Sequence, residues 1–141
     1  MDIDEAFKNY KTFLTSLTVD EIKRLSNFVR DDVKFKDPFH DTIGCEAMMA
    51  IFQRLFSSVE NIEFTVSDHA IQQQTIYFTW QLVGDLSAKP WVVEGVTRLK
   101  FDDSGKVAEH VEYWDAATQF YDRLPIIGAL LRYLRRRIAG S

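Results

Sequence analysis

Residues 91–115 predict a long antiparallel β-hairpin, and no other feature constrains the fold as strongly. Two runs rich in β-branched and aromatic residues, WVVEGVTRLKF and KVAEHVEYWD, flank the turn sequence DDSG at residues 102–105. Gly105 supplies the left-handed backbone conformation that such turns favour. Side chains alternate between the two faces of a strand, so His110, Glu112 and Trp114 share one face of the second arm. Ionisable groups on an otherwise apolar strand either face water or line a cavity.

Three helices are predicted before this hairpin. Apolar residues at three- and four-residue steps predict an amphipathic helix over residues 2–16. The sequence TVDE at residues 18–21 is a capping box that opens a second helix, in which Phe28 and Val29 are the last apolar positions. A third helix starts between Asp41 and Gly44 and carries a methionine-rich apolar stripe that includes Phe52. Such a stripe is typical of an adaptable core.

The strands are predicted from a change to period two. Residues 32–37 alternate in polarity and form a short strand that Pro38 ends, because proline has no backbone donor. Residues 62–66 and 76–82 alternate in the same way, with Phe78, Trp80 and Leu82 on one face of the later strand. Consecutive strands joined by short turns after three helices indicate the α+β class, with an antiparallel sheet and helices on one of its faces.

The C-terminal tail is a separate amphipathic unit. Residues 116–123 predict a short helix that Pro125 interrupts, and residues 126–137 then combine an apolar stripe with four arginines. We favour an arrangement in which the apolar side covers the domain and the arginines are solvated. The alternative is contact with a membrane surface or an acidic partner. We therefore expect one domain over residues 1–123 and an added basic helix over residues 124–141, packed on the domain or extending from it.

Charge and cysteine content narrow the class of protein. The net charge of −4 indicates no general attraction to nucleic acid. Cys45 is the only cysteine, so an intramolecular disulfide is excluded and a reducing compartment is favoured. The acidic start MDIDEAFKNYK does not resemble a signal peptide, and no apolar run approaches the ~20 residues of a membrane span. We expect a cytoplasmic protein.

Several motifs together resemble a known superfamily. The two leading helices, the segment RDDVKFKDPFH, the helix with Ile51 and Phe52, and the hairpin FDDSGKVAEHVEYW are similar to nuclear-transport-factor-2-like (NTF2-like) proteins, and within them to the SnoaL-like and ketosteroid-isomerase-like branch. The resemblance covers residues 1–120. It implies a strongly bent antiparallel sheet wrapped around three helices to form a cone with an apolar interior. It also implies a homodimer through the outer face of the sheet.

The resemblance places candidate site residues in that interior. Asp37, just before Pro38, matches the position of the general base of ketosteroid isomerases. His110 and Glu112 match inward positions of the strand after the turn, so the resemblance implies that these three residues converge as a catalytic group. The residues expected to contact a small apolar ligand are Tyr10, Phe13, Phe52, Phe78, Trp80, Leu82, Thr97, Leu99 and Trp114.

The chain also departs from the isomerase pattern. Ketosteroid isomerase stabilises its enolate with a tyrosine and a protonated aspartate. Phe13 and Thr97 stand at those positions here, and phenylalanine has no donor to offer. Tyr10 lies one helical turn before Phe13 and is the nearest replacement. These differences argue against a steroid isomerase.

Two functions from different classes remain open. The first is a small enzyme without cofactor or metal, an isomerase, dehydratase or cyclase, in which Asp37 and His110 transfer protons and Glu112 fixes the His110 tautomer. The second is a non-catalytic ligand-binding or dimerisation module, in which Asp37 is an ordinary turn former. His40 is expected on a surface loop, with a place at the mouth of the cavity as the alternative. No His pair has the helical i, i+4 spacing of a zinc site.

Overall fold

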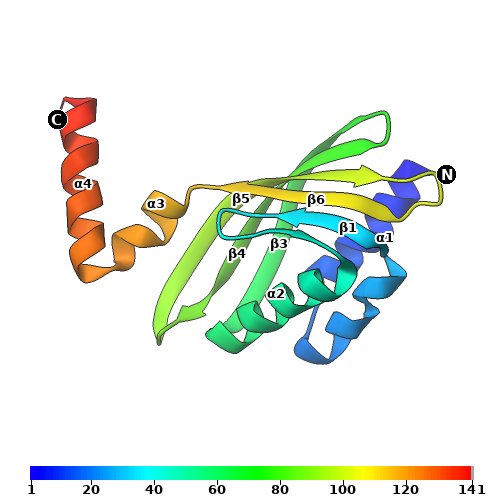
Figure 1. Ribbon diagram of the computed structural model, residues 1–141, viewed down its shortest axis with the longest axis horizontal. Coiled ribbons are helices and arrows are strands. Elements are labelled where there is room, and N and C mark those ends of the chain that lie inside the picture. Colours follow the sequence, from blue (N-terminus) through cyan, green and yellow to red (C-terminus); the bar gives the residue numbers. More distant parts are fainter. Residues whose placement is uncertain (141) are drawn as a thin grey trace.

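The computed structural model of the protein describes residues 1–140, and its secondary structure is of the expected α+β class (Figure 1). The elements in chain order are α1 (Ile3–Thr15), the 3₁₀ helix η1 (Val19–Asn27), β1 (Val29–Lys36), β2 (Asp41–Ile43), α2 (Cys45–Ser58), β3 (Val59–Gln72), β4 (Thr75–Leu86), β5 (Lys89–Phe101), β6 (Val107–Trp114), α3 (Ala116–Gln119), the 3₁₀ helix η2 (Tyr121–Arg123) and α4 (Pro125–Ala139).

The strands form one six-stranded sheet in the order β2-β1-β6-β5-β4-β3. The predicted hairpin is confirmed, because β5 and β6 pair antiparallel and Gly105 in the connecting turn has a φ of 86°. The expectation of a purely antiparallel sheet is wrong at one pair, since β1 runs parallel to β6. A parallel neighbour requires a long excursion of the chain back to the same end of the sheet. The path through α2 and β3 to β5 supplies this excursion.

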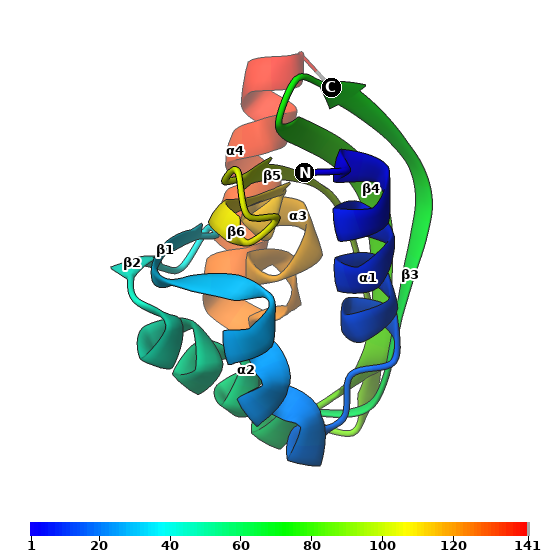
Figure 2. The same ribbon diagram turned by 90° about the vertical axis from the view of Figure 1, so that its right-hand side faces the viewer.

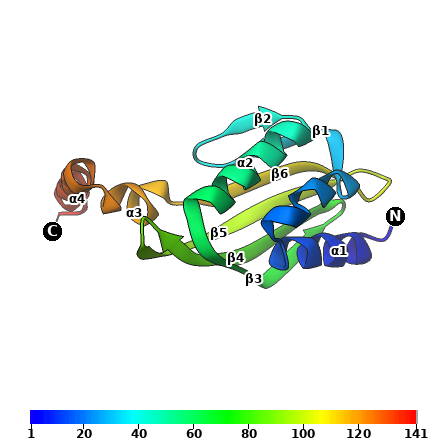
Figure 3. The ribbon, with the colours of Figure 1, turned by 90° about the horizontal axis from the view of Figure 1, so that it is seen from below.

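The helices α1, η1 and α2 lie across one face of the sheet (Figures 2 and 3). α1 packs on β3, whereas α2 packs on η1, β1 and β3. The local sequence explains both helix starts. The Asp2 carboxylate accepts hydrogen bonds from the backbone N–H groups of Asp4 and Glu5, and Gly44 precedes α2 with a φ of 115° that suits glycine.

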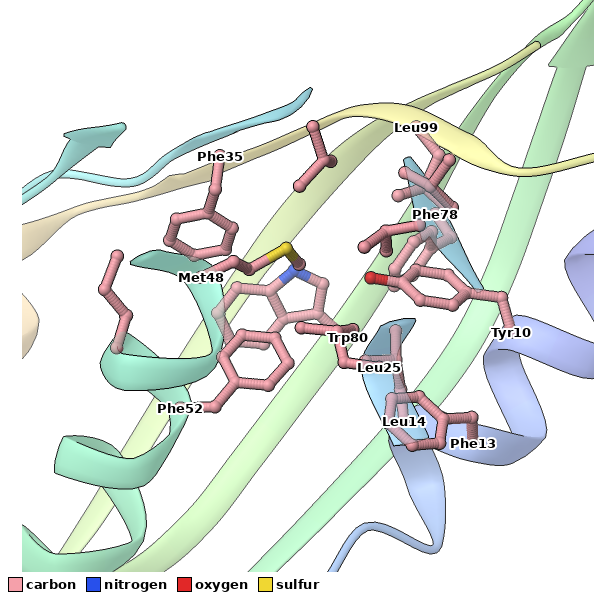
Figure 4. Close-up of a cluster of buried hydrophobic side chains, with 14 of the residues drawn as sticks. Tyr10, Phe13, Leu14, Leu25, Phe35, Met48, Phe52, Phe78, Trp80 and Leu99 are labelled. Atoms are coloured by element: carbon pink, nitrogen blue, oxygen red, sulfur yellow. The ribbon is translucent and has the colours of Figure 1, made fainter. Parts of the chain in front are cut away.

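The core lies between these helices and the sheet. Its aromatic side chains come from α1, β1, α2, β4 and β5, and Figure 4 shows the ring of Tyr10 extending from α1 into the middle of the cluster. Alternate residues of β4 are buried, including Phe78 and Trp80, so the period-two prediction for this strand is confirmed. This buried face of the sheet is also the face that carries the site.

Three local predictions are wrong. The second helix is a 3₁₀ helix, and its Thr18 side chain makes no cap hydrogen bond. Val29 belongs to β1 because it pairs with Val107, although helical spacing had placed it in the second helix. The predicted helix over residues 116–123 breaks at Phe120, whose φ of −130° ends α3. The short strand β2 was not predicted, because three residues are too few for a periodic signal.

The terminal helix α4 stands away from the sheet at the end of the molecule opposite the N-terminus (Figure 1). It packs chiefly against η2. Its apolar side chains remain exposed, which corrects the expectation that they cover the domain. Within residues 1–140, no helix is both long enough and apolar enough to cross a bilayer.

Candidate functional site

A cavity of about 470 Å³ opens on the helical side of the sheet. Its walls come from the end of α1, from α2, from the inward faces of β1 and of β3 to β6, from the turn between β1 and β2, and from Phe120, and they are mostly apolar. All three tryptophans of the chain, Trp80, Trp91 and Trp114, line it. The volume lies in the range of pockets that hold small organic molecules.

The structure brings most of the sequence-predicted site residues to this cavity. Asp37, His110 and Glu112 line it together with four of the predicted ligand-contacting residues, namely Phe52, Trp80, Leu82 and Trp114. The other five, Tyr10, Phe13, Phe78, Thr97 and Leu99, are not part of the lining and lie in the packed core. Their side chains face the interior of the domain as expected, but they are buried in the core and do not reach the cavity.

A chain of hydrogen bonds runs from the cavity wall into the core. The Nε2 atom of His110 lies 3.2 Å from a carboxylate oxygen of Glu112, and its Nδ1 atom lies 2.8 Å from the hydroxyl of Tyr10. The imidazole is 1% exposed and is packed against the ring of Phe35, with ring centroids 5.2 Å apart. Both ring nitrogens of His110 are therefore engaged, and Glu112 is the member of the chain closest to solvent.

The protonation states in this chain follow from the burial of Tyr10. Burial raises the pKa of the Tyr10 phenol well above its ordinary value of 10.0, and the nearby charge of Glu112 raises it further. The phenol keeps its proton, and His110 Nδ1 is its only hydrogen-bond partner among residues 1–140. When the Tyr10 hydroxyl donates to Nδ1, the N–H of a singly protonated imidazole is on Nε2, where it is donated to Glu112. The tautomer follows from this network.

A second acid–histidine pair lies on the same wall. The Asp37 carboxylate accepts hydrogen bonds from the backbone N–H groups of Phe39 and His40, at 2.8 and 2.7 Å, and so closes the turn between β1 and β2. The same oxygen lies 2.9 Å from Nδ1 of His40. Asp37 is thus both a turn former and a cavity residue. His40 lies in this turn with its side chain 29% exposed and lines the cavity, so of its two expected placements the one at the cavity fits the structure.

Strand register explains why the two pairs are neighbours. The parallel pairing of β1 and β6 aligns Phe35 with His110 and Lys36 with Val111. Asp37 therefore comes beside Glu112, one residue further along, on strands that lie ~4.8 Å apart. Asp37 and Glu112 also fall on the same face, because side chains alternate along both strands. This adjacency depends on the parallel pair that periodicity did not reveal.

Other cavity residues had no clear sequence signal. Trp91 opens β5, and its indole N–H donates to the carbonyl of Gln119 at 2.6 Å, so it also ties α3 to the sheet. Arg54 lines the cavity from α2. No part of residues 1–140 brings together three or more His, Cys, Asp or Glu side chains in a group that could hold a metal ion.

A family model of the SnoaL-like domain matches residues 10–110, which is more than half of the chain. The protein belongs to the SnoaL-like family. The match includes Tyr10, β1, α2 and β6 as far as His110. Asp37, His40, His110 and Glu112 form the polar wall of the cavity, and the match covers all of them except Glu112. A search of curated proteins finds no match to this SnoaL-like chain.

Solved structures show that this SnoaL-like protein has the NTF2-like, ketosteroid-isomerase-like fold. An NTF2-like protein of unknown function from Exiguobacterium sp. 255-15 is 13% identical with a TM-score of 0.68, and the similarity covers 78% of this chain and 98% of that one. A Jannaschia sp. CCS1 protein, provisionally named a SnoaL-like polyketide cyclase, is 15% identical with a TM-score of 0.72, over 82% and 87% of the two chains. An LEH-like epoxide hydrolase from M. tuberculosis is 16% identical with a TM-score of 0.69, over 98% of each chain. Such low identities establish the fold alone.

Proposed function

We propose that this SnoaL-like protein binds a small apolar molecule with one polar end in the cavity and transfers protons on it without a cofactor. The cavity would be the cone-shaped interior that the family resemblance implies. Its apolar walls suit a hydrocarbon skeleton, and its two acid–histidine pairs lie on one wall, where they can orient a carbonyl or hydroxyl group. The observation that carries the proposal is the pairing of two carboxylates with two histidines on this wall.

Each acid–histidine pair has a different role: one removes a proton from the ligand and the other returns one. Glu112 accepts a proton from a carbon next to the ligand carbonyl, because its carboxylate faces the cavity and His110 orients it through Nε2. The C–H bond breaks and its electron pair forms an enolate. His40 acts as an imidazolium whose Nδ1–H is donated to Asp37, and it donates the proton on Nε2, which has no partner among residues 1–140, at a second position of the ligand. After the product leaves, Glu112 releases the proton it took to water and His40 regains one from water, which restores both groups. Asp37 and His110 are then positioning residues.

This sequence of steps is redox-neutral and requires only a dry pocket and two proton-transfer groups. Return of the proton to another carbon gives an isomer, loss of a hydroxyl from the neighbouring carbon gives a dehydration, and attack of the enolate on a second carbonyl of the same ligand gives a ring. Two structural relatives carry the names of a polyketide cyclase and an epoxide hydrolase, and their low identities leave the choice of substrate and reaction to the cavity of this chain.

A second candidate is a ligand-binding module without catalysis. It is favoured by the surroundings of Thr97, whose hydroxyl accepts a hydrogen bond from the indole N–H of Trp80 at 2.8 Å and is 0% exposed. Thr97 therefore cannot stabilise an enolate in the cavity. Phe13 is buried in the core and has no donor.

Intrinsic fluorescence tests binding, because every tryptophan of the chain lines the cavity. We expect small cyclic ketones to change the tryptophan emission of the wild type. A Leu55→Arg variant, which places a charge in the wall, should lose this response, whereas Ile43→Arg on the exposed strand β2 should keep it. If no ketone in the panel changes the emission, the proposed ligand class is wrong.

Turnover then separates the two candidates. In a screen of enones and hydroxy-ketones, Glu112→Gln and His40→Gln should lower the rate by about 10²-fold or more while the fluorescence response to the ligand is kept. Binding without turnover by the wild type would favour the ligand-binding module. Turnover that both variants retain in full would refute the assignment of the proton-transfer groups.

A further inference from the structure

The helix α4 carries an apolar stripe that no other part of residues 1–140 covers. Its side chains recur at three- and four-residue steps, which places them on one side of the helix. They are 44% to 88% exposed, so the domain does not shield them. The residues of the stripe are Ile126, Ile127, Leu130, Tyr133, Leu134 and Ile138.

The opposite side of α4 holds the helix on the domain. Arg132 donates a hydrogen bond to the carbonyl of Asp122 at 2.6 Å, and Arg135 donates two to the carboxylate of the same residue, at 2.9 and 2.5 Å. Gly128 packs directly against the Asp122 carbonyl, where a larger residue would collide with the backbone. The polar side therefore faces the domain and the apolar stripe faces outward. This is the reverse of the usual arrangement for a helix on a globular domain.

Positive charge is concentrated on the same helix. α4 contains four arginines and no acidic residue. Because the whole chain has a net charge of −4, these four positive charges leave the remaining residues with −8. Arg136 and Arg137 are exposed in the last turn. Arg136 lies beside the apolar stripe, and Arg137 lies on the same side as the stripe, where it donates a hydrogen bond to the Tyr133 hydroxyl at 3.3 Å. The chain thus presents one cationic, apolar element on an otherwise acidic molecule.

We propose that α4 docks the protein on an anionic lipid surface, with the apolar stripe inserted among the acyl chains and Arg136 and Arg137 at the headgroups. Amphipathic helices of this composition lie in the plane of a membrane interface, and basic side chains add attraction to anionic lipids. α4 is too short and too polar to span a bilayer, so it lies on the surface. Because the hydrogen bonds to Asp122 fix α4 on the domain, the stripe is already exposed before the protein contacts a lipid surface.

A second copy of the chain is a poorer occupant of the stripe. A helix of 15 residues is about 22 Å long and its apolar side about 10 Å wide. Two such sides packed together bury far less than the ~1,200 Å² at which stable protein interfaces begin. Parallel packing of two α4 helices would also bring their C-terminal arginines together.

Co-sedimentation of the full chain with lipid vesicles tests this docking. We expect the wild type to bind vesicles of phosphatidylcholine mixed with phosphatidylglycerol, and to bind at least about tenfold more weakly to phosphatidylcholine alone or at high salt. Leu130→Asp should weaken binding by about tenfold or more, whereas Ile43→Asp, at an even more exposed apolar position on β2, should bind like the wild type. Circular dichroism checks that both variants fold.

A charge-matched pair of double variants tests the role of the arginines. Arg136→Gln with Arg137→Gln should weaken binding to the mixed vesicles by about tenfold or more. Lys34→Gln with Lys36→Gln, which removes the same charge from the exposed face of β1, should leave it unchanged. The proposal is overturned if the wild type does not bind the mixed vesicles or if Leu130→Asp binds them equally well. It is also overturned if sedimentation shows a dimer that Leu130→Asp dissociates and no vesicle binding.

Discussion

Replacing Tyr10 with phenylalanine isolates the hydrogen bond at the inner end of the polar wall. The Tyr10→Phe change keeps the ring and removes only the hydroxyl, which lies 2.8 Å from Nδ1 of His110. That nitrogen belongs to a side chain only 1% exposed, so water does not replace the lost donor. A buried acceptor left without a partner costs ~1–3 kcal/mol. We expect the free energy of unfolding to fall by about this amount.

Urea denaturation followed by tryptophan fluorescence measures this loss. With a denaturant dependence of ~1–3 kcal/mol per molar urea, the midpoint should fall by about 1 M and the slope should not change. Tyr113→Phe is the matched control, because Tyr113 is 58% exposed on the same sheet and its hydroxyl faces solvent. The reasoning is refuted if Tyr10→Phe unfolds at the wild-type midpoint, or if Tyr113→Phe lowers the midpoint equally.

Combining Tyr10→Phe with Glu112→Gln tests whether the hydrogen bonds act as one chain. Tyr10 and Glu112 do not hydrogen-bond to each other, and both bind the ring of His110. If the Tyr10 hydroxyl sets the tautomer that donates to Glu112, the two changes should show a coupling energy of ~0.5–3 kcal/mol in a double-mutant cycle. Strict additivity would mean that the two bonds are independent.

Three further outcomes follow from the structure. Because burial raises the pKa of Tyr10 above 10.0, its contribution to stability is present below pH 10 and is lost as the pH rises through the folded-state pKa, so alkaline denaturation should be steeper in the wild type than in Tyr10→Phe. Gly95→Ala should lower the free energy of unfolding by ~1–3 kcal/mol and shift the emission of Trp80, because the added Cβ would lie 2.5 Å from the Trp80 ring. Asp122→Asn should speed amide hydrogen exchange in α4 at neutral pH, because it weakens the bidentate pair with Arg135, while exchange in α1 stays unchanged.

Much of the fold could be predicted because packing imposes a period on the sequence. One face of β4 is buried, so its apolar residues alternate, and the turn before β6 needs glycine at a positive φ, so Gly105 marks the hairpin. Periodicity says nothing about which strands are neighbours, and the parallel pair of β1 and β6 was missed for this reason. Val29 fitted both a helix and a strand, and only the pairing with Val107 decides between them.

The candidate site could be predicted only in part. The alternation along β6 and the family resemblance placed His110 and Glu112 on one inward face, and both line the cavity. The bond between Tyr10 and His110 joins residues one hundred positions apart, and no local pattern encodes it. The amphipathic pattern of α4 was visible in the sequence. Its orientation was not, because that depends on how closely Gly128 approaches Asp122.

The central claim is that the polar wall of the cavity moves protons on a bound apolar ketone, and hydrogen isotope exchange measures this directly. In deuterium oxide, proton NMR should show that the wild type exchanges the hydrogens next to the carbonyl of a ketone that changes its tryptophan emission. Glu112→Gln should slow this exchange by about 10²-fold or more, whereas Glu63→Gln on β3, outside the cavity lining, should exchange at the wild-type rate. Equal exchange rates in Glu112→Gln and the wild type, with the ketone bound in both, would contradict the account.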